Sequence, residues 1–338
     1  MAMLSKLALL VPVSLVMGCA PGVLRGPQDP EQLQAAIERL AEPVGGTVGV
    51  GVRHIETGRE FYLNRSVRFP MGSVFKLPLA VQLLTLVDQN AVSLEKTVVV
   101  QPGDLRAGSG KLAKSYGDPQ SLSLRRLLET MLIDSDNSAT DILWKEAGGS
   151  KAVMARLAAL GIKGISVDRP TALLLSAAAG IGPVPPDIEL TPDKFSELSR
   201  KVPRAKREAA AAAFLKDERD TTTPAALVDL LSKIWRGEAL SADRTGLLID
   251  IMIRCETGKG RLKGRLPVGT QVAHKTGTLR PSVTNDAGVI RLPDRAGHLA
   301  VVVLIKESKE NLLIQERTIA EITRVLYDYF SFNLGRAS

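Results

Sequence analysis

A serine and a lysine three residues apart, Ser73 and Lys76, stand where an apolar run begins in Phe69-Pro70-Met71-Gly72-Ser73-Val74-Phe75-Lys76. A helix over residues 73 to about 89 would place both side chains on one face, one turn apart. Free backbone N–H groups and the positive end of the helix dipole would then lie near the serine hydroxyl. These surroundings suit a serine nucleophile and a lysine base, because neither group is reactive at its ordinary pKa. The pattern alone also fits a helix-start serine and a solvated lysine, since about one or two such matches arise by chance at this length.

Two further motifs supply groups for the same chemistry. Ser135-Asp136-Asn137 follows an apolar segment that ends near Ile133, and Lys275-Thr276-Gly277-Thr278 follows an expected strand. Each tripeptide arises by chance in only roughly a few per cent of chains this long. The three motifs in this order are typical of active-site serine β-lactamases and penicillin-binding proteins.

The chain resembles class A β-lactamases from the hairpin near Val48 to its last helix. Arg169 and Asp220 match the pair that closes the neck of that family's Ω-loop. Further matches are Thr257-Gly258, Leu266-Pro267, His274 and the cleft loop Arg106-Ala107-Gly108-Ser109-Gly110.

The resemblance and the chemistry imply the same catalytic roles. Ser73 would attack the carbonyl of a strained lactam or of a D-alanyl peptide. Lys76, whose pKa burial and the neighbouring Lys275 would lower, would accept the Ser73 proton. Ser135 would relay that proton to the leaving nitrogen, because a hydroxyl both donates and accepts.

Substrate binding is implied for five residues. Asn137 would hold Lys76 and the substrate amide, and Lys275 and Thr276 would bind the substrate carboxylate. Gly277 lies in the same motif, and the backbone N–H groups of Ser73 and Thr278 would form an oxyanion hole.

The sequence departs from the family in the Ω-loop. The family has a Glu, the base for deacylation, where this chain has Thr171, and an Asn where it has Leu175. Acylation through Lys76 and Ser135 should survive, whereas hydrolysis of the acyl-enzyme should be slow. Glu189 and Glu197 lie in the enlarged loop, but nothing in the sequence indicates that either side chain lies near Ser73.

Three functions follow as hypotheses. The first is a β-lactam hydrolase with a non-standard, slow deacylation. The second is a penicillin-binding D-alanyl-D-alanine peptidase, which the missing Glu favours. The third is a non-enzymatic β-lactam- or partner-binding protein, against which the intact set of Ser73, Lys76, Ser135 and Lys275 argues.

Periodicity predicts the elements that position these motifs. Alternation over 47–53 and 61–63 predicts a hairpin, and strand character returns at 271–274, 287–292 and 299–306. Helical spacing covers residues 31–41, 122–132, 139–147, 150–160, 224–235 and about 310–329, with Ser123 and Thr223 as expected N-caps. Strands at both ends and helices between them predict an antiparallel sheet flanked by N- and C-terminal helices, with an inserted helical domain. The expected division is 31–68 and 258–338 for the α/β domain and 69–257 for the helical domain.

The resemblance implies an Ω-loop that is enlarged by an insertion over residues 176–216. It begins with glycines and prolines and continues as a basic helical segment over 193–214. Long insertions of this kind are usually functional or disordered. Its basic side chains either solvate a surface helix or contact an acidic partner.

The N-terminus predicts export. Lys6 precedes an apolar run over residues 7–17, which is too short to span a bilayer and suits a signal peptide. Val16-Met17-Gly18-Cys19 resembles a lipoprotein processing box, which would lipidate Cys19 and attach the protein to a membrane; a plain signal peptide over 1–19 is the alternative. Residues 20–30 would be a tether, and the expected location is the periplasm or cell envelope.

Composition excludes other partners. The 338 residues carry a net charge of +8, but only 4% are aromatic and no basic run alternates with aromatics, so nucleic acid is not expected. Three scattered histidines and two cysteines show no metal-ligand spacing. We therefore expect no metal or cofactor, a β-lactam or a cell-wall D-alanyl peptide as substrate, and a monomer.

Overall fold

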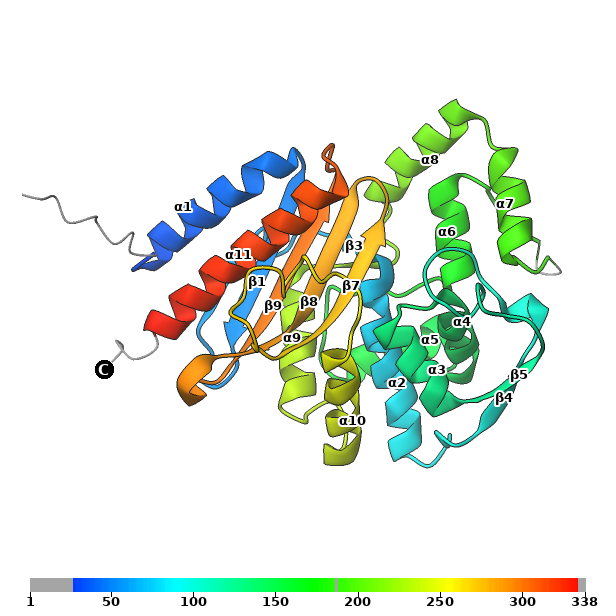
Figure 1. The fold of residues 1–338 in the computed structure, drawn as a ribbon, viewed down its shortest axis with the longest axis horizontal. Helices are drawn as coiled ribbons and strands as arrows, with labels where there is room; N and C mark the ends of the chain where they lie inside the picture. Colours follow the sequence, from blue (N-terminus) through cyan, green and yellow to red (C-terminus); the bar gives the residue numbers. More distant parts are fainter. Residues whose placement is uncertain (1–26, 186–187, 334–338) are drawn as a thin grey trace, which may run out of the picture.

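The computed structural model describes residues 27–185 and 188–333. The predicted signal peptide, Cys19 and most of the tether lie outside these residues. A five-stranded antiparallel sheet in the order β2-β1-β9-β8-β7 joins the two ends of the chain (Figure 1), which confirms the predicted sheet. Its strands are β1 (Thr47–His54), β2 (Glu60–Leu63), β7 (Val272–Leu279), β8 (Val283–Arg291) and β9 (His298–Lys306).

Both faces of this sheet are covered by helices. Helices α1 (Pro30–Ala41) and α11 (Leu312–Asn333) lie on one face, and α9 (Pro224–Trp235) packs on the other (Figure 1). Strand β9 is therefore apolar from residue 299 to residue 305, with Val301 and Val303 in one core and Val302 and Leu304 in the other. In β1 the valines face α1 and α11, while a Cβ at Gly51 would meet Val228 of α9. The alternating glycines thus let α9 approach the sheet closely.

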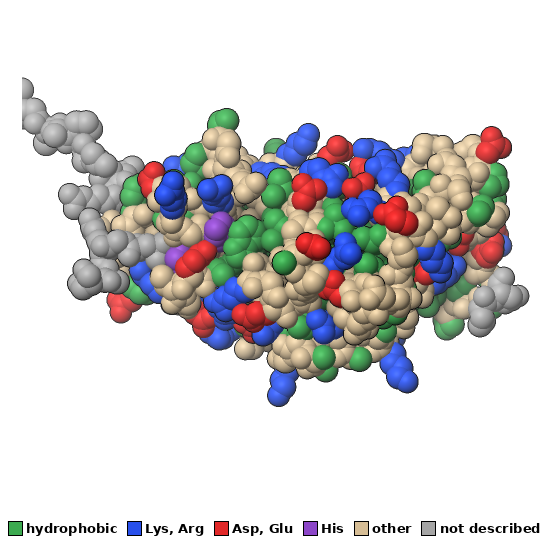
Figure 2. Space-filling model, turned by 90° about the horizontal axis from the view of Figure 1, so that it is seen from below, with side chains coloured by type: hydrophobic (Ala, Val, Ile, Leu, Met, Phe, Trp, Pro, Cys, Tyr) green, Lys and Arg blue, Asp and Glu red, His purple; other side chains and the backbone are tan. Residues whose placement is uncertain are grey.

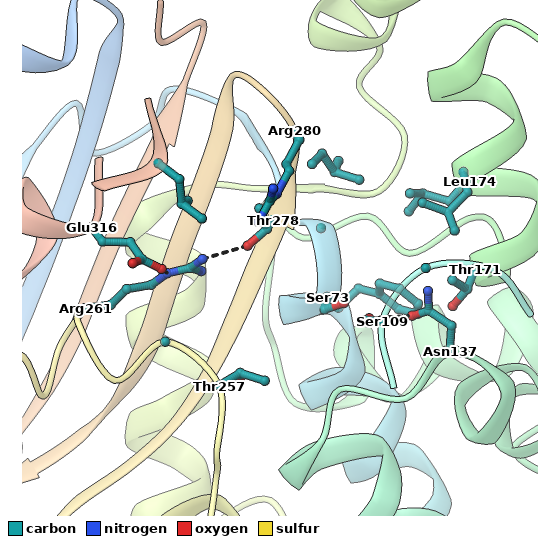
Figure 3. Close-up of a pocket in the computed structure, with 17 residues that line it drawn as sticks. Ser73, Ser109, Asn137, Thr171, Leu174, Thr257, Arg261, Thr278, Arg280 and Glu316 are labelled. Atoms are coloured by element: carbon teal, nitrogen blue, oxygen red, sulfur yellow. Dashed lines mark hydrogen bonds and ion pairs between the residues drawn. The ribbon is translucent and has the colours of Figure 1, made fainter. Parts of the chain in front are cut away.

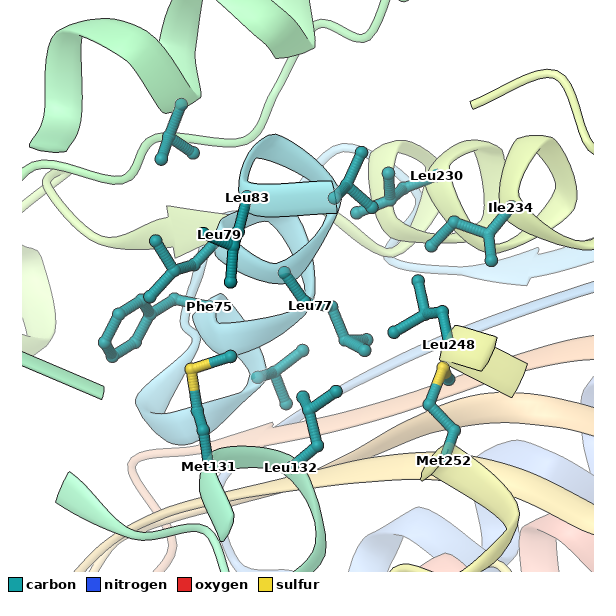
Figure 4. Close-up of a cluster of buried hydrophobic side chains, with 14 of the residues drawn as sticks. Phe75, Leu77, Leu79, Leu83, Met131, Leu132, Leu230, Ile234, Leu248 and Met252 are labelled. Carbon is teal, nitrogen blue, oxygen red and sulfur yellow. The ribbon is translucent and has the colours of Figure 1, made fainter. Parts of the chain in front are cut away.

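The helical part of the chain is built around α2 (Lys76–Asp88), which is apolar on nearly all sides and buried along most of its length. Its leucines lie between residues of the neighbouring helices, such as Met131, Leu230 and Leu248 (Figure 4). The surrounding helices are α9 and, in addition, α3 (Leu124–Ile133), α4 (Asn137–Glu146), α5 (Gly149–Ala159) and α10 (Ala242–Ile253). Helix α6 (Thr171–Ala179) packs against α4. This packing holds the start of α2 rigidly against the sheet.

The expected caps are present. Ser123 accepts a hydrogen bond from the Arg126 N–H at the start of α3, and Thr223 accepts one from the Ala226 N–H at the start of α9. Two pairs of short strands were not predicted, because each is too short for its periodicity to show. They are β3 (Phe69–Pro70) with β6 (Thr221–Thr222), and β4 (Thr97–Val100) with β5 (Gln120–Ser123).

The helix predicted from residue 73 begins later. Gly72–Phe75 form a 3-10 helix, and the α-helix starts at Lys76. Gly72 has φ +51° and lies against the backbone of Gly277 and Thr278 in β7. This contact holds the turn beside the sheet, so Ser73 lies in a tight turn ahead of the α-helix.

The stretch predicted to be an enlarged Ω-loop is mostly helical. The predicted single segment over 193–214 is two helices, α7 (Pro192–Arg200) and α8 (Arg204–Lys216), and α6 precedes them. Pro203 separates α7 from α8, because a proline disfavours helical geometry in the residue before it. Figure 1 shows α6, α7 and α8 grouped at the end of the molecule away from α1 and α11.

Charge is spread over the surface. On the face shown in Figure 2, acidic and basic side chains are interspersed. Within the described residues, no helix combines the length and apolarity needed to cross a bilayer.

Candidate active site

A cavity of about 470 Å³ lies where the edge strand β7 meets the helical part of the chain. Figure 3 shows Ser73, Ser109 and Asn137 on one side of it, Arg261, Thr278 and Glu316 on the other, and Thr171 and Leu174 reaching in from α6. Of the predicted residues, Ser73, Asn137 and Thr278 line this cavity. Lys76, Ser135, Lys275 and Thr276 are buried beside it.

Lys76 is fully buried, and its ammonium nitrogen forms hydrogen bonds with the Ser135-Asp136-Asn137 motif. Its Nζ donates to the Ser135 carbonyl oxygen (2.6 Å), the Asn137 Oδ1 (3.0 Å) and the Ser135 Oγ (3.3 Å). Burial, and then the charge of Lys275, hold the pKa of Lys76 well below its usual range. A lysine in this state gives up its proton more readily than an exposed lysine, which suits a base.

Ser135 lies between two amines. Its Oγ accepts a hydrogen bond from Lys275 Nζ at 2.9 Å and faces Lys76 on the other side. Its backbone has φ +59°, a left-handed conformation that a serine rarely adopts. This conformation allows the carbonyl and the hydroxyl of one residue to reach Lys76 together.

Lys275 is also fully buried. Burial lowers its pKa to about 8, and Arg261 adds to the effect, while Cys255 and Asp286 oppose it. It therefore remains largely protonated at neutral pH. A buried ammonium beside a cavity is suited to a carboxylate ligand.

Ser73 is positioned by its backbone. The Asn285 side chain donates to the carbonyl oxygens of Pro70 (2.8 Å) and Met71 (3.0 Å), which ties the preceding residues to the sheet. A Cβ at Gly277 would collide with the Met71 carbonyl oxygen and lie 3.2 Å from the Ser73 nitrogen. Glycine there lets the turn approach β7, which brings the backbone nitrogens of Ser73 and Thr278 close together. Within the described residues, the Ser73 hydroxyl has no hydrogen-bond partner and faces the cavity.

Asn137 connects Lys76 to the loop over 106–110. Its Oδ1 accepts from Lys76 and from Ser109 Oγ (3.2 Å), and its Nδ2 donates to the Ala107 carbonyl oxygen (2.8 Å). Gly108, with φ +97°, faces the amide, and a Cβ there would crowd Nδ2. The loop resembling the family's cleft loop therefore forms one rim of the cavity.

Behind the Lys275-Thr276-Gly277 strand, polar side chains are paired inside the fold. Thr276 Oγ1 lies 2.6 Å from Thr257 Oγ1, and His274 Nδ1 lies 2.9 Å from the Asp286 carboxylate. Burial opposes protonation of His274, but Asp286 outweighs it and raises the pKa of the imidazole to about 9. This support holds the strand in place.

Arg261 and Glu316 were missed from the sequence. Arg261 is buried, donates to Thr278 Oγ1 (2.8 Å) and to the carbonyl oxygens of Gly277 and Asn285, and pairs with Glu316 (3.0 Å). Both residues line the cavity. A lone arginine in a loop carries no periodic or motif signal. Asn285 could have been found, because Thr284-Asn285-Asp286 is a polar run inside an otherwise apolar strand.

The wall formed by α6 differs from the rest of the cavity. It consists of Thr171, Leu174 and Leu175. The Thr171 hydroxyl is buried and has no hydrogen-bond partner among the described residues, while the Thr171 and Ala172 N–H groups donate to Asp141. Among the residues that line the cavity in the described part of the chain, Glu316 is the sole carboxylate.

The two other glutamates considered for this role are engaged elsewhere. Glu197 pairs with Lys194 and Lys201, and the Glu189 carboxylate lies against Gly103. Neither lines the cavity.

The predicted neck of the Ω-loop is confirmed. Asp220 accepts from the Arg169 side chain and from the N–H groups of Asp168 and Arg169, and the Asp220 N–H donates to Asp168. Arg169 also pairs with Asp217 (3.2 Å). This neck sets the position of α6 and hence of Thr171.

The arrangement has the parts of an acyl-transfer site. A free hydroxyl faces the cavity, a buried amine with a lowered pKa lies one turn away, and a second hydroxyl bridges two amines. The described residues contain no group of three or more His, Cys, Asp or Glu side chains placed to hold a metal ion.

Comparisons with known proteins identify the family. A model of the beta-lactamase enzyme family matches residues 32–330. The extended-spectrum beta-lactamase PER-1 of Pseudomonas aeruginosa is 31% identical over 88% of this chain and 87% of its own. Beta-lactamase VEB-1 of the same species is 28% identical over 89% of this chain and 91% of its own.

Solved structures agree with these sequences. A beta-lactamase from Chitinophaga pinensis superposes with a TM-score of 0.73 at 30% identity, over 88% of this chain and 98% of its own. The TLA-1 extended-spectrum beta-lactamase has the same score and identity, over 89% and 99%. From the matched fold, the matched length and the family model, we conclude that the chain belongs to the beta-lactamase enzyme family and is a serine hydrolase like those of class A.

Proposed function

We propose that the protein opens β-lactam rings by forming an acyl-enzyme on Ser73 and releases it slowly. Ser73 Oγ attacks the lactam carbonyl carbon, and its proton passes to neutral Lys76. The C–N bond of the ring then breaks, and Ser135 delivers the proton to the leaving nitrogen. The hydrogen bonds of Ser135 with Lys76 and Lys275 support this relay.

The substrate is held by the remaining residues. Lys275 and Thr276 bind its carboxylate, and Asn137 orients Lys76 and the substrate amide. The backbone N–H groups of Ser73 and Thr278, which Gly277 allows to lie close together, bind the developing oxyanion.

Slow release is supported by one observation, the α6 wall. A base for hydrolysis must hold a water near the ester carbonyl and remove its proton. This wall offers Thr171, Leu174 and Leu175, and the only carboxylate lining the cavity in the described part of the chain is paired with Arg261. By its resemblance to the family, Thr171 stands at the position where the deacylating glutamate is expected.

The same observation favours a second candidate function. A site that acylates well and hydrolyses poorly behaves as a penicillin-binding D-alanyl-D-alanine peptidase. In that case the natural substrate is a cell-wall peptide, and a β-lactam is its inhibitor.

Either substrate lies outside the cytoplasm, which agrees with the predicted signal peptide. We propose a periplasmic or cell-envelope location, with Cys19 as the residue that would carry a lipid anchor, and a monomeric protein.

The test is to mix purified protein with a fluorescent penicillin and, separately, with a chromogenic cephalosporin. A lasting label with few turnovers supports slow release, and many turnovers per minute would contradict it. Ser73→Ala should take up no label, and the thermal midpoint of this variant shows whether it is folded. Release of D-alanine from a D-alanyl-D-alanine peptide, absent in Ser73→Ala, would support the peptidase.

A further inference from the structure

A second cavity, of about 690 Å³, lies on the other side of α6, between α6 and α8. None of the residues that line it lines the catalytic cavity. Helix α6 separates the two: Leu174 and Leu175 face the catalytic cavity, whereas Leu173, Ser176 and Ala177 face the second one. Most of the residues that line the second cavity belong to the predicted insertion over residues 176–216.

Small side chains create this space. Helix α8 contributes Ala210 and Ala213 to the lining. The C-terminal end of α6 contributes Ala177 and its cap residue Gly180. Larger apolar groups remain at the sides, because Phe214, Val184 and Leu173 complete the walls. Leu173 is 42% exposed, so part of this apolar surface is open to solvent. The walls therefore present apolar surface that no described residue covers.

Positive charge gathers on the same cavity. Arg169, Lys206 and Arg219 line it, against the single carboxylate of Asp217. Asp217 is already bound by Arg219 and Arg169. Lys206 is exposed and forms no hydrogen bond or ion pair with any described residue.

Arg169 supplies a buried polar group without a partner. It is 8% exposed, its Nε and Nη1 pair with Asp220 and Asp217, and its guanidinium lies over the Phe214 ring at 5.2 Å. Its Nη2 is buried with no hydrogen-bond partner. Buried donors of this kind are rarely left unpaired.

We propose that this cavity binds a small amphiphilic anion, in which a carboxylate or phosphate head is joined to an alkyl or aryl body. The head lies toward Arg169, Lys206 and Arg219, and the body packs against Leu173, Val184 and Phe214. The size suits such a ligand, because ligand sites typically measure about 300–1,000 Å³ and are mainly apolar with a few polar groups.

The position of α6 gives this site a consequence for catalysis. A ligand against one side of α6 contacts the helix that carries Thr171, Leu174 and Leu175 into the catalytic cavity. The bound anion therefore alters the rate at which the acyl group leaves Ser73; this second part rests on the proposed function.

The test is calorimetry with decanoate below its micelle-forming concentration, beside decanol and decyltrimethylammonium. Decanoate should bind at one site per chain and at least tenfold more tightly than either comparison compound. Equal binding of decanoate and decanol would contradict the proposed preference for an anion. No binding of decanoate would contradict the proposal that the cavity is a ligand site.

Matched variants locate the site. Ala210→Trp fills the cavity and should weaken decanoate at least tenfold, whereas Ala212→Trp, on the exposed side of the same helix, should not. Lys206→Glu should weaken it about fivefold or more, whereas Lys151→Glu, an exposed change of the same charge on α5, should not. Equal effects within either pair would place the ligand elsewhere.

The binding test does not depend on catalysis. Decanoate should bind Ser73→Ala and the penicillin-labelled protein as tightly as the free wild type. Binding to the second cavity can therefore be tested even if no β-lactam reacts. Loss of decanoate binding on labelling would instead place it in the catalytic cavity. If the label forms, saturating decanoate should change its loss at least twofold in wild type and not in Ala210→Trp.

Discussion

The two sides of the catalytic cavity are built differently. On the side of Ser73, Lys76, Ser135 and Lys275, polar side chains are buried and bonded to one another. On the side of α6, two leucines and a threonine with an unpaired hydroxyl form the wall. Under the proposed function, the first side supplies the groups for bond formation to Ser73, and the second supplies no carboxylate for hydrolysis of that bond. The proposal therefore assigns the two steps of the mechanism to two differently built walls.

The largest expected effect is on the polar side. Lys76→Met removes the base but keeps the length of the side chain, so acylation by fluorescent penicillin should slow about 10³-fold. The thermal midpoint of the variant checks that it is folded, because the substitution leaves the Ser135 carbonyl oxygen and Asn137 Oδ1 without their lysine donor. Stopped-flow labelling measures the rate, and labelling within tenfold of wild type would show that Lys76 is not the base.

The next effect is on the α6 side. Thr171→Glu should speed loss of the penicillin label by about tenfold or more, because a carboxylate there can take a proton from water. Thr171→Gln is the matched control, since it has the same shape but no basic oxygen, and its label should persist. If both variants release the label equally, the wall does not face the ester as proposed.

The pH dependence tests the two lysines together. Acylation needs neutral Lys76 and charged Lys275. The rate should therefore rise with pH through the lowered pKa of Lys76 and fall as pH rises through about 8, where Lys275 loses its proton. Beyond that point the fall should approach about tenfold per pH unit.

Lys275→Arg should move this alkaline fall upward, because arginine keeps its charge. A pH profile of the second-order labelling rate checks it. An unchanged alkaline limb would assign the fall to another group.

The smallest effect concerns the rim. Glu316 partly neutralises Arg261 beside the cavity, so Glu316→Gln should raise the acylation rate of an anionic β-lactam about threefold, the scale of a partly exposed ion pair. A neutral β-lactam ester should show no change. Equal effects on both substrates would point to a structural role for the pair.

Much of the fold was predictable. Alternation in Thr47–His54 and helical spacing in Pro224–Trp235 mark elements whose apolar side chains lie in the cores on the two faces of the sheet. Their predicted boundaries agree with the structure to within a residue. The division of the basic insertion into α7 and α8 was missed, although Pro203 gave a signal for it. The short strands β3 and β6 have no period to detect, because their pairing joins residues about 150 apart in the chain.

The order of the motifs and the threonine at position 171 are properties of the sequence itself. They determined the class of chemistry and pointed to position 171 as the residue on which deacylation depends, because residue type and spacing along the chain carry that information. Tertiary structure alone decided that Asn285 anchors the Ser73 turn, that Glu316 forms an ion pair with Arg261, and that α6 separates two cavities. These contacts join elements far apart in the chain, and their geometry depends on how whole faces pack, which no local pattern records.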